Sequence, residues 1–152
     1  MNHTFLMEPG RWTLQGNWLE RDGLPIAMKG KLIVAWSRDD WFTLITKLTF
    51  PQAPDREDMT LHYRGRLDQG DRRYTFVLQH SILGRIEGEG WVAPESLVQR
   101  HWVLGDRQRR SGFETLYRLS DDRYYLASTM LTGHALTNMM EATLERQAAP
   151  LT

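Results

Sequence analysis

The 152-residue chain contains no cysteine. This absence excludes disulfide bonds, thiolate metal sites and a cysteine nucleophile. It also agrees with a reducing compartment, and we expect the protein to be cytoplasmic.

Long hydrophobic runs are missing as well. No apolar stretch approaches the roughly 20 residues that a helix needs to span a bilayer. The chain does not open with a basic segment followed by an apolar one, the pattern of a secretory signal. We therefore expect neither export nor a membrane span.

Charge of one sign is not in excess, because nineteen Lys and Arg side chains balance nineteen Asp and Glu side chains. A neutral chain has no long-range field that would attract polyanions, so we predict no nucleic-acid partner. The basic run at residues 106–110 is more typical of a solvated turn than of a phosphate site. The five histidines lack the spacing of metal ligands, and no catalytic serine motif occurs, so the sequence predicts no metal and no catalytic residue.

Composition indicates one ordinary globular domain over residues 1–152, with 41% hydrophobic and 25% charged residues. A chain of this length can bury most of its apolar surface in a single core. No linker or low-complexity tract divides it. The oligomeric state stays open, with a homodimer as one alternative.

Alternation of apolar and polar residues is the dominant pattern. From Gly10 to Trp18, every second residue is glycine or a large apolar residue, and the residues between them are polar. This is the pattern of a half-buried strand. Similar segments, joined by turns such as Asp22-Gly23, follow along the chain. The pattern predicts an all-β protein, a single antiparallel up-and-down β-barrel of about eight to ten strands.

The two ends and one glycine pair leave alternatives. Residues 1–9 form either one helical turn or a plug at one end of the barrel. Residues 135–147 fit a helical stripe and a closing strand equally well. Gly88 and Gly90, on an otherwise apolar strand face, indicate a sharp bend or the close approach of another group.

The Gly10-Arg11-Trp12 opening of the first predicted strand resembles the Gly-x-Trp signature of the calycin superfamily, which includes lipocalins, fatty-acid-binding proteins and bacterial relatives. The tail at residues 136–146, Leu-Thr-Asn-Met-Met-Glu-Ala-Thr-Leu-Glu-Arg, is similar to the last strand of nitrobindin-like haem-binding barrels. That resemblance implies a strand that closes the barrel and carries the haem-ligating His. Met139 occupies the position of that His, so the resemblance supports the fold more than haem binding.

Candidate site residues are the large or polar side chains on the faces that the apolar pattern predicts to point inward. For His80 the alternative is a strand-end histidine bonded to backbone. For Arg100 the alternative is a solvated side chain, with Leu97, Gln99, His101 and Val103 inward instead. An inward Arg100 would favour an anionic guest. Thr115 and Ser128 share these faces, and the predicted ligand-binding set is Trp18, Trp36, Tyr63, Phe76, His80, Arg100, Tyr117 and Met139.

The leading functional hypothesis is that the barrel binds a small, largely apolar ligand. Whether this ligand is neutral or anionic stays open. Binding is favoured over catalysis. One alternative is a haem-binding, nitrobindin-like protein or an isomerase, with haem as the only cofactor that the resemblance suggests. Another is a scaffold that transfers a chromophore or lipid to a protein, as bilin lyases of calycin fold do.

Overall fold

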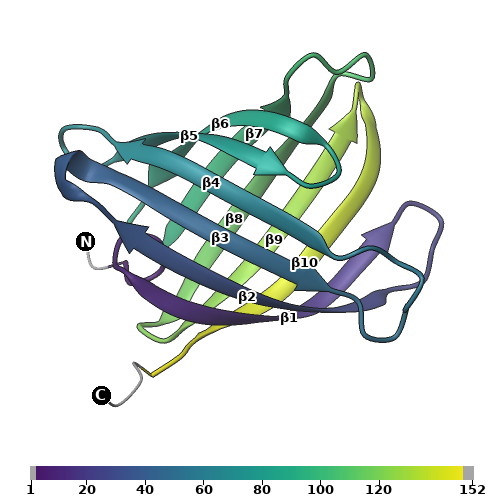
Figure 1. The fold of residues 1–152 in the computed structure, drawn as a ribbon, viewed down its shortest axis with the longest axis horizontal. Coiled ribbons are helices and arrows are strands. Elements are labelled where there is room, and N and C mark those ends of the chain that lie inside the picture. Colours follow the sequence, from purple (N-terminus) through teal and green to yellow (C-terminus); the bar gives the residue numbers. More distant parts are fainter. Residues whose placement is uncertain (1–2, 149–152) are drawn as a thin grey trace.

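Ten antiparallel strands follow one another around a closed barrel in the computed structural model, which describes residues 3–148 (Figure 1). Each strand pairs with its neighbours in sequence, and the first pairs with the last. The crossing layers in Figure 1 are the near and far walls of this barrel. The strands are β1 (Gly10–Glu20), β2 (Ile26–Trp36), β3 (Trp41–Thr49), β4 (Met59–Leu67), β5 (Arg73–His80), β6 (Gly84–Val92), β7 (Ser96–Val103), β8 (Arg110–Ser120), β9 (Arg123–Thr132) and β10 (Ala135–Arg146).

The closing strand resolves the ambiguity of the tail. β10 pairs with β1 from Trp12 opposite Arg146 to Glu20 opposite Asn138, and on its other side it pairs with β9. Ala142 and Leu144 are buried in the core. Local pattern gave helix and strand equal support, and the free edges of β1 and β9 decide for the strand because they offer a complete ladder of backbone partners.

The connections match the turn chemistry of the sequence. A short 3-10 turn, η1 (Arg38–Asp40), joins β2 to β3. The proline-containing segment at residues 51–58 is a loop. Within residues 3–148 no helix is long and apolar enough to cross a bilayer.

Residues 3–9 close one end of the barrel, in agreement with the plug alternative. Phe5 and Leu6 are only 2% and 3% exposed. The rings of Phe5 and Tyr124 meet the Trp12 indole at centroid distances of 5.3 and 5.7 Å, both edge to face. The Trp36 indole N–H donates to the Leu6 carbonyl at 2.8 Å. Aromatic packing and this hydrogen bond therefore hold residues 3–9 against the barrel wall.

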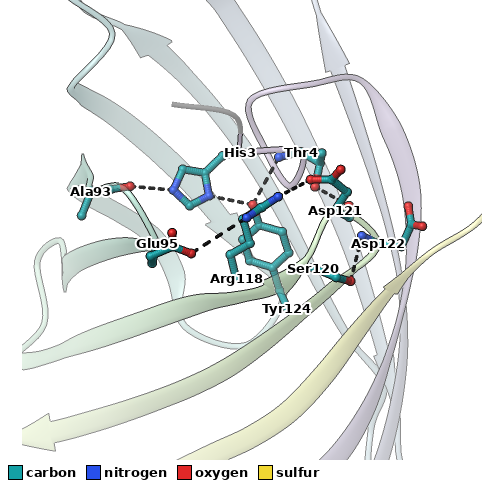
Figure 2. A network of polar contacts seen from close by, with 9 residues as sticks. All are labelled: His3, Thr4, Ala93, Glu95, Arg118, Ser120, Asp121, Asp122 and Tyr124. Carbon is teal, nitrogen blue, oxygen red and sulfur yellow. Dashed lines mark hydrogen bonds and ion pairs between the residues drawn. The ribbon is translucent and has the colours of Figure 1, made fainter.

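Polar contacts fix the plug to two turns (Figure 2). The His3 Nε2–H donates to the Ala93 carbonyl at 2.7 Å, which leaves Nδ1 to accept from the Tyr124 hydroxyl at 2.6 Å. The Thr4 amide donates to the same hydroxyl, and the Thr4 hydroxyl donates to the Asp121 carbonyl. Both ring nitrogens of His3 and the amide and hydroxyl of Thr4 thus have partners, as buried polar groups require.

The glycines of β6 allow rings from neighbouring strands to approach. A Cβ added at Gly88 would lie 2.3 Å from the Phe76 ring, and one at Gly90 would lie 2.0 Å from the Tyr74 ring. The close approach predicted from the glycine pair is confirmed. The Tyr74 and Phe76 rings consequently help to fill the middle of the barrel.

Candidate ligand-binding cavity

A cavity of about 720 Å³ occupies the barrel at the end away from the plug. It extends from the β1–β2 turn and the β3–β4 loop inward to side chains of β4–β10. Most of its walls are apolar, formed by Trp18, Leu48, Met59, Leu61, Leu78, Ile82, Leu83, Ile86, Met130 and Met140. Its volume and its mostly apolar lining are typical of a small-molecule site.

The mouth carries an ordered arginine. Arg56 Nη2 lies 2.6 Å from Glu20 Oε1. The guanidinium lies over the Trp18 and Phe50 rings, at 5.3 and 4.9 Å from their centroids. The hydrogen bond from Arg56 is the main cause that lowers the pKa of Glu20. The charge of Arg56 is therefore already compensated, and its plane stacks on aromatic rings as guanidinium groups favour.

A chain of polar groups from three strands leads to the cavity wall at Glu114. The Tyr74 hydroxyl donates to Gln99 Oε1 at 2.7 Å, and Gln99 Nε2 donates to Glu114 Oε2 at 2.8 Å. His101 Nδ1 lies 3.8 Å from Glu114 Oε1, too far for a hydrogen bond. Glu114 is only 14% exposed, and among residues 3–148 its Oε1 accepts no hydrogen bond. This wall thus presents a carboxylate oxygen with unused acceptor capacity.

His80 has a fixed protonation pattern. Its Nδ1 accepts the backbone N–H groups of Ile82 and Leu83, each at 3.1 Å, so the ring proton resides on Nε2. Burial is the main cause that lowers the pKa of His80 to about 4, and the charges of His101 and Arg110 lower it further. The strand-end histidine considered from sequence is found here, and the same side chain also lines the cavity.

Tyr63 is a neutral phenol in the cavity wall. Its burial raises its pKa well above the usual value, and the charges of Glu114 and Tyr74 raise it further. Its hydroxyl has no hydrogen-bond partner within the described part of the chain, residues 3–148, so it is available to a ligand.

The structure brings together three of the side chains predicted to bind ligand: Trp18, Tyr63 and His80. Trp36 is at the plugged end, and Phe76 is packed against the Tyr63 and Tyr74 rings in the filled middle. Neither lines the cavity.

Arg100 lies on the outer face of the barrel. It is 57% exposed, pairs with Glu89 at 2.8 Å and covers the Trp102 ring. Leu97, Gln99, His101 and Val103 are buried, which is the alternative pattern considered for this strand. Arg100 therefore cannot reach a ligand inside, and the argument for an anionic guest loses its supporting residue.

The inward face of β8 differs from the one inferred from hydropathy. Tyr117 is 49% exposed, and Thr115 also belongs to the outer face, whereas Gly112, Glu114 and Leu116 point inward. A shift of one residue moves every side chain to the opposite face. The inward face of β8 carries a glycine and a carboxylate, and the outer face carries aromatic residues. Hydropathy therefore favoured the wrong face.

Met139 is not part of the cavity wall. Its neighbour Met140 lines the cavity, and alternate residues of a strand point to opposite faces. Ser128 on β9, which pairs with Glu114 on β8 and Met140 on β10, does line it. Within residues 3–148, no three His, Asp or Glu side chains gather as a metal site.

No family model matches the chain, and no curated protein is similar to it in sequence. Solved structures that share its fold include the following two. The crystal structure of Rv2717c from M. tuberculosis aligns with a TM-score of 0.70 and 14% identity over 91% of this chain and 92% of that one. The S-type phycobiliprotein lyase CPES from Guillardia theta aligns with a TM-score of 0.66 and 12% identity over 93% and 89%. Likeness at this identity shows the barrel fold and nothing finer.

Proposed function

We propose that this protein binds a small, largely apolar molecule in the open half of its barrel. The observation that carries the proposal is the cavity of about 720 Å³, with apolar walls and a few convergent polar groups. The fold shared with a phycobiliprotein lyase agrees with a role that involves a bound small molecule.

Haem fits this cavity poorly. Met139 is outside it, and Nε2 of His80 carries the ring proton because Nδ1 accepts two backbone amides. The Nε2 side of His101 lies against Gly112, where an added Cβ would be 2.5 Å away. An axial ligand needs an unprotonated, accessible imidazole nitrogen or a thioether that faces the iron. Thioethers of Met59, Met130 and Met140 do line the cavity, but methionine would be an unusual sole protein ligand of haem iron. We therefore favour an organic ligand that needs no axial coordination.

A titration with the neutral, apolar dye N-phenyl-naphthylamine tests the proposal. We expect its emission to rise on binding, because the dye leaves water for an apolar wall. Ser128→Trp should abolish the rise by filling the cavity. Thr129→Trp, one residue along on the other face of β9, is the matched control and should bind as the parent does. Equal binding by both variants would place the dye outside the barrel and contradict the proposal.

A further inference from the structure

We infer that the ligand of this cavity carries a cationic nitrogen, such as an ammonium group, which binds Glu114. This inference rests on the proposed function and assigns the chemical class of the ligand. An inward Arg100 would have favoured an anionic ligand, whereas Glu114 favours a cationic one.

The first step is the distribution of charge around the cavity. Its lining contains three carboxylates, from Glu20, Asp22 and Glu114, and two guanidinium groups, from Arg21 and Arg56. Every one of these groups except Glu114 belongs to the mouth, and there Arg56 is paired with Glu20. Glu114 is thus the one carboxylate in the wall below the mouth among residues 3–148.

The second step is the incomplete partnering of Glu114. Oε2 accepts from Gln99, but Oε1 accepts no hydrogen bond within residues 3–148, and His101 Nδ1, 3.8 Å away, is within ion-pair distance but beyond hydrogen-bond reach. An apolar guest that covered this oxygen would remove its water and leave a buried carboxylate oxygen without a hydrogen bond, which is costly. A cationic N–H group replaces that water with a charge-assisted hydrogen bond.

The third step is the position of the neighbouring polar groups. His80 and Tyr63 line the same cavity, and both stay neutral at ordinary pH. Neither supplies a positive charge that would satisfy Glu114 in place of a ligand. The Tyr63 hydroxyl oxygen can accept a further N–H from the same ligand group.

Competition against bound N-phenyl-naphthylamine tests the inference with three compounds of similar shape: naphthylmethylamine, naphthylmethanol and naphthoate. At neutral pH the first is a cation, the second is neutral and the third is an anion. We expect the amine to displace the dye at about a tenfold lower concentration than the alcohol, and naphthoate to compete least.

Glu114→Gln keeps the shape of the side chain and its contact with Gln99 but removes the charge. In this variant the amine and the alcohol should compete within about twofold of each other. Glu141→Gln is the control. The Glu141 carboxylate accepts from the Tyr125 hydroxyl on the outer face, so this variant should preserve the preference for the amine.

Equal competition by the three compounds against a bound dye would overturn the inference and leave the proposed function standing. A preference for the amine that persists in Glu114→Gln would also overturn it. Failure of the dye to bind the parent protein would overturn both.

Discussion

The two ends of this barrel use the same strands for opposite purposes. At the plugged end, the inward residues are large aromatics that pack edge to face, and residues 3–9 fill the remaining space. At the open end, aliphatic side chains and a few polar ones leave about 720 Å³ unfilled. Alternation alone builds the wall, and the size of the inward side chains decides which half is core and which half is site.

The largest expected difference between the two ends is in stability, and substitution of one tryptophan from each end should reveal it. Trp12→Ala should lower the free energy of unfolding by about 3–5 kcal/mol, because it removes a 1% exposed indole from the plug contacts. Trp18→Ala should cost less than about 2 kcal/mol, since Trp18 is half-buried beside existing empty space. Urea unfolding measures both, and equal losses would contradict the division into core and site.

A smaller effect on stability should come from His80 at the open end, and it should depend on pH. The folded-state pKa of His80, about 4, lies below the ordinary value of 6.5, so between these pH values the unfolded chain binds the extra proton. Its contribution to stability is complete above pH 6.5 and is lost as the pH falls toward 4. The loss should be on the order of 1–3 kcal/mol.

His80→Asn supplies an acceptor for the same loop amides without a titrating ring. Its free energy of unfolding should change less between pH 6.5 and pH 4 than that of the parent protein. His62→Asn, at an exposed position on β4, is the control for replacing a surface histidine. An unchanged slope in His80→Asn would show that the ring is not held neutral by its surroundings.

The strand pattern was sufficient to predict the barrel but only part of the site. Trp18, Tyr63 and His80 were predicted to point inward and do line the cavity, because each falls on a clearly alternating strand. Arg100 and Tyr117 were placed inward, and both lie outside, because β7 and β8 carry apolar or aromatic residues on both faces.

Glu114 was missed for a physical reason. Hydropathy assigns a carboxylate to solvent, whereas the register of β8 places this one at the cavity wall, where Gln99 on β7 donates to it. Arg56 was missed because a loop residue shows no periodicity, although it covers Trp18 and Phe50 at the mouth. Contacts between segments far apart in sequence thus define the polar part of the site.

The indole N–H resonances of the six tryptophans offer the most direct test of the central claim, that the open half of the barrel is the binding site. On addition of N-phenyl-naphthylamine, the resonance of Trp18, assigned with Trp18→Phe, should shift most, because only Trp18 among the tryptophans lines the cavity. Resonances of Trp41, Trp91 and Trp102 should hardly move. Shifts concentrated on those three, with Trp18 unmoved, would place the ligand on the outer sheet and contradict the account.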